Sequence, residues 1–71
     1  MLGALIQAER RRRGWSQREL GRRAGLTQPK ISGIERGGRP WVPSLVLVRL
    51  AAALELPVED LERAAGPQLR R

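Results

Sequence analysis

The 71-residue sequence contains no cysteine and no histidine, and its only aromatic residues are two tryptophans. Without cysteine the chain has neither disulfides nor thiolate ligands for a metal. Without histidine it lacks the commonest metal ligand and the usual general base of hydrolytic enzymes. Its serines therefore have no partner of the usual kind to activate them. We expect neither an enzyme nor a protein that binds a cofactor, a metal or a small-molecule substrate.

Long apolar segments are also missing. The longest uncharged stretch that is largely apolar covers residues 40–48, far short of the roughly 20 residues that cross a bilayer. The N-terminal residues do not combine a basic region with a long apolar core, as a signal peptide does. We expect no membrane attachment and a cytoplasmic location. A chain of this length forms one small domain, which buries only about 60% of its unfolded surface.

Positive charge is abundant and unevenly distributed. The chain has a formal net charge of +7, and residues 1–39 hold ten basic residues against three glutamates, a surplus of seven. Residues 40–71 hold four arginines against four carboxylates, a surplus of zero. A basic half joined to a neutral half is the charge distribution expected of a protein that binds a polyanion on one side. A merely solubilising surface is the alternative.

Hydrophobic spacing and helix-end signals predict an all-α chain. Apolar residues at helical spacing predict a first helix over about 2–13, which ends at Gly14. Ser16-x-x-Glu19 is a capping box, in which the serine oxygen accepts from the amide three residues on and the glutamate reaches back. This motif predicts a second helix over about 17–24.

Similar signals predict three further helices. Thr27 is a good N-cap for a third helix over about 28–36, with a proline in its first turn. Ser44 is expected to cap a fourth helix to about residue 55, and a fifth begins at Pro57. No segment alternates with period two over enough residues to indicate a sheet. The sequence predicts a compact five-helix domain over residues 1–66, followed by a frayed tail over 67–71.

The second and third predicted helices, joined by a glycine-bearing turn, form a helix-turn-helix pattern. In that motif the first helix crosses the DNA backbone and the second enters the major groove N-terminal end first. A glutamine at the start of the groove-entering helix, such as Gln28 in the third predicted helix, bonds bidentately to the N6/N7 edge of adenine. We predict backbone contacts from Ser16, Gln17, Arg36 and Arg39, and base contacts from Thr27, Gln28, Lys30, Ser32 and Gly33.

At these residues the chain resembles the phage repressor/Cro-type helix-turn-helix family, also called the XRE family. The resemblance covers about residues 2–65 and is carried by spaced matches. These are Ile6-x-x-x-Arg10, Trp15-Ser16-Gln17-x-Glu19-Leu20, Ala24-Gly25-Leu26-Thr27-Gln28, Ile31-Ser32-x-Ile34-Glu35-x-Gly37 and Leu50-Ala51-x-Ala53-Leu54.

The resemblance implies a lambda-repressor-like five-helix bundle that binds a two-fold operator as a dimer. It also implies a phosphate contact from Gln17, base contacts from Gln28 and its neighbours, and a structural pair between Arg10 and Glu35. Two residues depart from the family pattern. Pro29 and Gly33 occupy positions that often carry base-reading side chains, and neither side chain donates a hydrogen bond, so DNA shape should take a larger share of recognition.

The fourth predicted helix has more apolar residues than one inward stripe requires. An exposed apolar cluster in so small a domain usually marks an interaction site, and we predict a homodimer interface there. Its residues are Trp41, Val42, Leu45, Val46 and Val48. Alternatively, Trp41 and Val42 fold over the helix and complete a satellite core. The functional hypothesis is a sequence-specific DNA-binding transcriptional regulator, a repressor, with double-stranded DNA as its partner. The alternative is a protein-interaction module that keeps the bundle with little DNA specificity.

Overall fold

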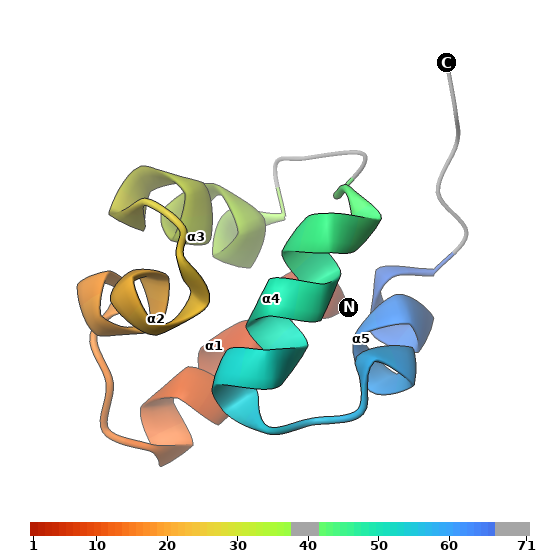
Figure 1. Ribbon diagram of the computed structural model, residues 1–71, viewed down its shortest axis with the longest axis horizontal. Coiled ribbons are helices and arrows are strands. Elements are labelled where there is room, and N and C mark those ends of the chain that lie inside the picture. Colours follow the sequence, from red (N-terminus) through yellow and green to blue (C-terminus); the bar gives the residue numbers. More distant parts are fainter. Residues whose placement is uncertain (38–41, 67–71) are drawn as a thin grey trace.

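The structure, a computed structural model, describes residues 1–37 and 42–66. These residues form five helices and no strand, which confirms the all-α prediction (Figure 1). The predictions for Arg39, Trp41 and the tail 67–71 lie outside the described residues. The helices are α1 (Leu2–Arg12), α2 (Gln17–Ala24), α3 (Gln28–Arg36), α4 (Ser44–Leu54) and α5 (Val58–Ala65).

Side-chain caps begin α2 and α3 as the sequence predicts. The Ser16 hydroxyl accepts from the Glu19 amide at 3.0 Å, and the Thr27 hydroxyl accepts from the Lys30 amide at 3.3 Å. Only the serine bond of the capping box forms in α2. The Glu19 carboxylate does not reach back to Ser16, because it accepts from Arg22 and Arg23 one turn later along the helix. The turn between α2 and α3 passes through Gly25, whose φ of 70° favours glycine.

The ends of α4 differ from the prediction. Ser44 is the first helical residue and makes no capping bond, and Pro43 occupies the N-cap position. The expectation that Ser44 caps this helix is therefore wrong, because a residue with helical geometry does not aim its hydroxyl at the free amides as an N-cap does. At the other end the chain leaves the helix through Glu55, which has a φ of 56°.

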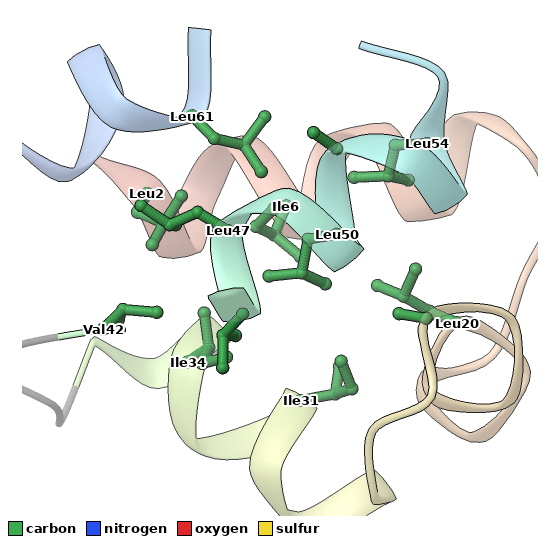
Figure 2. Close-up of a cluster of buried hydrophobic side chains, with 13 residues drawn as sticks. Leu2, Ile6, Leu20, Ile31, Ile34, Val42, Leu47, Leu50, Leu54 and Leu61 are labelled. Carbon is green, nitrogen blue, oxygen red and sulfur yellow. The ribbon is translucent and has the colours of Figure 1, made fainter. Parts of the chain in front are cut away.

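The core is built around α4, with α2 and α3 on one side of it and α5 on the other (Figure 1). Leu47, Leu50 and Leu54 point inward and are almost fully buried. Figure 2 shows these leucines among side chains from the other helices, which converge on one cluster. These partners are Leu2, Ile6, Leu20, Ile31, Ile34 and Leu61.

Two residues of the predicted dimer interface belong to this core. Val42 and Val46 are 5% and 9% exposed and pack in the central cluster. Their assignment to a dimer surface is wrong, because the inward stripe of α4 is wide enough to include position 46 beside 47 and 50. Val42 lies in the main core rather than in the satellite core that was the alternative for it and Trp41. Leu45 and Val48 are 61% and 50% exposed, so they remain the apolar surface of α4.

Two glycines allow helices to approach closely. A Cβ on Gly21 would lie 2.5 Å from the carbonyl oxygen of Leu26, in the turn that leads to α3. A Cβ on Gly3 would lie equally close to the carbonyl oxygen of Glu35, at the end of α3. The Cβ of any larger residue at either position would overlap that carbonyl oxygen and force the two segments apart. These contacts fix α3 against α1 and α2.

Candidate nucleic-acid interface

The N-termini of α2 and α3 meet through two glutamines. The side-chain Nε2 of Gln28 donates to Oε1 of Gln17 at 2.7 Å. Gln17 in turn donates from its own Nε2 to Oε1 of Glu35 at 3.1 Å. The sequence predicted a backbone contact from one glutamine and a base contact from the other. The structure shows in addition that they form one hydrogen-bonded unit.

The predicted pair between Arg10 and Glu35 is confirmed. Arg10 donates from Nε and Nη2 to the two carboxylate oxygens at 2.7 and 3.0 Å, which is the bidentate geometry that strengthens such pairs. The side chains are 9% and 2% exposed. Arg10 also donates from Nη1 to the carbonyl oxygen of Trp15 at 2.8 Å, which ties α1 to the start of α2.

The charge state of Glu35 follows from its partners. Burial alone would raise the pKa of this carboxyl, but hydrogen bonds from Arg10 and Gln17 and the charge of Arg10 outweigh burial and lower the pKa below its ordinary value. The carboxylate is therefore ionised at neutral pH and accepts all the bonds that converge on it. Hydrogen bonds thus connect Arg10 to Glu35, Glu35 to Gln17 and Gln17 to Gln28. We call this series of hydrogen-bonded side chains the glutamine chain.

The glutamine chain leaves Gln28 the groups that base recognition needs. An amide side chain has one acceptor oxygen and a nitrogen with two N–H groups. Gln17 takes one of these N–H groups. The other N–H and the Oε1 remain, and together they match the N7 acceptor and N6 donor of adenine. Gln28 is half-buried and Thr27 is exposed at the same helix tip, so this end of α3 is accessible.

The outward face of α3 carries few side chains that donate hydrogen bonds. Ile31 and Ile34 are buried against the core. The opposite face is formed by Pro29, Gly33 and Arg36, at spacings of four and three residues. Proline and glycine bring no donor, as noted from the sequence. The long side chain of Arg36 is therefore the main polar group on this face.

Two residues that the sequence assigned to different roles are in contact here. Nη1 of Arg36 donates to Oγ of Ser32 at 2.5 Å. The sequence analysis placed Ser32 among the base contacts and Arg36 among the backbone contacts, and did not link them. Their separation of four residues, which puts both on one side of a helix, is the signal that indicates the contact.

The cations of the first three helices divide into paired and unpaired groups. Glu9 pairs with Arg12 and Arg13, and Glu19 pairs with Arg22 and Arg23. Hydrogen bonds from these arginines lower the pKa of both glutamates. Over residues 1–37, the cations without a carboxylate within 4.0 Å are Arg11, Arg18, Lys30 and Arg36. Part of the surplus positive charge therefore lies on α3 itself.

Sequence reasoning missed two arginines that tie helices together. Arg49 of α4 donates from Nη1 to the carbonyl oxygen of Gly25 at 3.2 Å and so holds the turn between α2 and α3. Arg13 donates to the carbonyl oxygen of Leu54 at the end of α4. Both bonds join segments far apart in the chain, and no local pattern in the sequence indicates them.

A family model described as a helix-turn-helix domain matches residues 1–64. The chain belongs to this helix-turn-helix domain family. The family assignment agrees with the resemblance found in the sequence, and it covers α1 to α5 almost completely. The helix-turn-helix pair itself is α2 and α3, joined at Gly25.

Two curated relatives and one solved structure are similar to this helix-turn-helix domain. An uncharacterized HTH-type transcriptional regulator of Sinorhizobium fredii, y4dL, is 50% identical over 66 residues, which are 92% of this chain and 33% of that protein. Another, YgzD of Bacillus subtilis, is 38% identical over 57 residues, 79% of this chain and 83% of that one. The chain thus spans about a third of the first relative and most of the second.

The solved structure is a crystal structure of SinR, the master regulator for biofilm formation, in complex with DNA. It superposes on this helix-turn-helix domain with a TM-score of 0.81 and 31% sequence identity, over 87% of this chain and 98% of that chain. This likeness confirms the fold class. In the described residues no helix has the length and apolar character that a membrane span requires.

Proposed function

We propose that this chain is a sequence-specific DNA-binding transcriptional regulator, a repressor located in the cytoplasm, that reads a two-fold operator as a homodimer. The observation that carries the proposal is the glutamine chain, which orients Gln28 at the accessible tip of α3. The similarity to SinR, a regulator solved in complex with DNA, supports the same role. The role is one of binding and involves no catalysis.

In this proposal α3 enters the major groove with its N-terminal end. Gln28 bonds to adenine, and Thr27, Lys30, Ser32 and Gly33 approach neighbouring bases. Gln17 and Ser16 meet the sugar-phosphate backbone at the start of α2, where free backbone N–H groups favour a phosphate. Arg39, which lies outside the described residues, is proposed as a further phosphate contact.

Homodimerisation is supported by the exposed apolar residues of α4 and by the size of the domain. Leu45 and Val48 lie one turn apart on the surface of α4. One module of this size meets few base pairs and phosphates, whereas two linked modules bind far more tightly.

Sedimentation at high micromolar concentration should show a dimer, and replacing Leu45 and Val48 together by serine should shift it toward monomer. A wild-type protein that remains monomeric under these conditions, also on DNA, would contradict this part of the proposal.

The main experiment is selection of bound sequences from a random DNA pool. The wild type should enrich a two-fold site with half-sites about one helical turn apart, and its affinity should fall steeply with salt because counterions are released. Gln28→Ala should lose the preference for adenine at one position of each half-site. Arg63→Ala, an exposed change on α5, is the control and should select the wild-type site. An unchanged preference in Gln28→Ala would show that the assigned reading helix is wrong.

A second candidate is a protein-interaction module that keeps the bundle with little DNA specificity. Pro29 and Gly33 on the outward face of α3, together with the exposed Leu45 and Val48, favour it. A mobility shift with random-sequence DNA at moderate salt separates the candidates. No shift by the folded wild type would favour the interaction module, and a shift followed by enrichment of a specific site would exclude it.

A further inference from the structure

Arg36 makes a hydrogen bond to a side chain of its own helix. It lies in the last turn of α3, and its Nη1 donates to the Ser32 hydroxyl at 2.5 Å, one turn nearer the N-terminus of the helix. Arg36 is exposed, and no carboxylate of the described residues pairs with it. The guanidinium therefore lies along the helix toward its groove-entering end.

The residues next to Arg36 on the outward face of α3 lack hydrogen-bond donors. Pro29 and Gly33 share the outward face with Arg36 and supply no donor. If Arg36 extended away toward the phosphates, the outward face that it forms with Pro29 and Gly33 would present no side-chain donor to the base edges. A long helical side chain naturally points back toward the N-terminus, and the Ser32 hydroxyl holds it there.

We propose that Arg36, positioned by Ser32, reads a guanine in the major groove. This inference rests on the proposed function. Guanine is the base that presents two acceptors, O6 and N7, on its major-groove edge, and a guanidinium binds both with parallel N–H groups. After one N–H is given to Ser32, the rest of the guanidinium remains available. Arg36 thus becomes a specificity residue rather than the backbone contact expected from the sequence.

The geometry also places the guanine relative to the adenine read by Gln28. Ser32, which anchors the guanidinium, lies four residues beyond Gln28 on α3. This separation is about 6 Å along the helix axis, which corresponds to roughly two base-pair steps of B-form DNA when α3 lies along the groove. Each half-site should therefore contain a guanine about two steps from the adenine.

The test compares the wild type with Arg36→Ala, which removes the guanidinium, and Ser32→Ala, which removes the anchor. Arg36→Ala should lose the guanine preference at one position per half-site, by roughly 5- to 100-fold, and keep the adenine of Gln28. Ser32→Ala should weaken the same preference partially. Replacing that guanine by 7-deazaguanine, which lacks the N7 acceptor, should weaken binding of the wild type and leave Arg36→Ala unaffected.

Controls separate this inference from the proposed function. Arg63→Ala, on the distant α5, should select the wild-type site, and circular dichroism should show all variants folded. If Arg36→Ala still selects the same guanine and weakens binding to all sequences alike, with a shallower salt dependence, Arg36 contacts a phosphate and the inference is wrong. A wild type that enriches no sequence at all would instead overturn the proposed function together with the inference.

Discussion

The first three helices and the last two are stabilised in different ways. In the half formed by α1–α3, which we call the polar half, side-chain caps begin α2 and α3, and the glutamine chain connects all three helices. In the half formed by α4 and α5, which we call the apolar half, prolines precede both helices without side-chain capping bonds, and α4 contributes five buried residues to the core. The surplus charge lies entirely in residues 1–39.

This difference indicates a division of work. The polar half presents donors and cations at an exposed helix tip, so its side chains must be held by hydrogen bonds rather than by burial. The apolar half gives those helices a surface to pack on, and its buried residues affect DNA binding only through the fold. Changes in the two halves should therefore be distinguishable by whether stability or DNA recognition is lost first.

The largest effect is expected in the apolar half, from Leu50→Ala. Leu50 is fully buried at the centre of the cluster in Figure 2. Truncation of a buried leucine costs about 2–5 kcal/mol, a large fraction of the stability of so small a domain. Urea denaturation followed by circular dichroism measures the loss. The control is Glu62→Ala, an exposed change on α5 away from the proposed dimer surface, which should change stability by less than about 0.5 kcal/mol. Equal losses for both variants would contradict the core described here.

The stability of the polar half should be nearly as sensitive to changes in the buried ion pair between Arg10 and Glu35. Arg10→Met leaves the Glu35 carboxylate buried without its main partner, and breaking such a pair costs about 3 kcal/mol. The double variant Arg10→Met with Glu35→Leu removes both charges and should recover part of this loss. The measurement is again urea denaturation. A double variant less stable than the single one would show that the pair does more than satisfy two buried charges.

The same pair predicts a pH dependence. The pKa of Glu35 is lowered in the folded state by its hydrogen bonds and by Arg10, so the unfolded chain binds this proton more tightly. The stability from ionised Glu35 is therefore fully present above the ordinary carboxyl pKa and is lost as the pH falls through the lower, folded value. Thermal melts between neutral pH and strongly acidic pH should show this loss, and Glu35→Gln should flatten its part of the profile.

Much of the fold could be predicted from the sequence, because its signals are local. Helical spacing, glycine stops and the caps Ser16 and Thr27 predict the bounds of the helices to within about one residue. The predictions failed where a nonlocal contact or a backbone detail decides. Whether Val46 faces the core depends on how widely neighbouring helices surround α4, and Pro43 displaced Ser44 from the capping position.

The candidate site was predictable as a set of residues but not as a network. The pair between Arg10 and Glu35 was expected from the family resemblance, and the two glutamines were expected as DNA contacts. Their hydrogen bond, and the bond between Ser32 and Arg36, depend on side-chain orientations that residue types do not determine. Sequence spacing indicates which side chains are close enough to bond, and their orientation in the folded chain decides which of them do.

The link between the glutamines gives an intermediate prediction. The sequence alone suggests that Gln17→Ala weakens binding to all DNA sequences alike. Because Gln17 also holds the amide of Gln28, its truncation should in addition relax the preference for adenine, with a total cost of about 1–2 kcal/mol in binding. Competition assays with the selected site and a site altered at that adenine measure both effects. An affinity loss that is identical for the two sites would show that Gln28 keeps its orientation unaided.

The smallest expected effect returns to the apolar half, at the end of α4. Glu55 adopts a left-handed conformation with a φ of 56°, in which the Cβ of any L-residue is crowded and glycine is not. The Glu55 and Leu56 amides there bond to carbonyl oxygens of the last turn of α4, as in a glycine-ended helix. Glu55→Gly should therefore stabilise the domain by about 1 kcal/mol, seen as a higher urea midpoint. Ala52→Gly, within the same helix and exposed, should instead destabilise by about 1 kcal/mol. Since neither residue belongs to the proposed DNA interface, both variants should select the wild-type site, and the opposite signs would isolate a backbone effect in the apolar half.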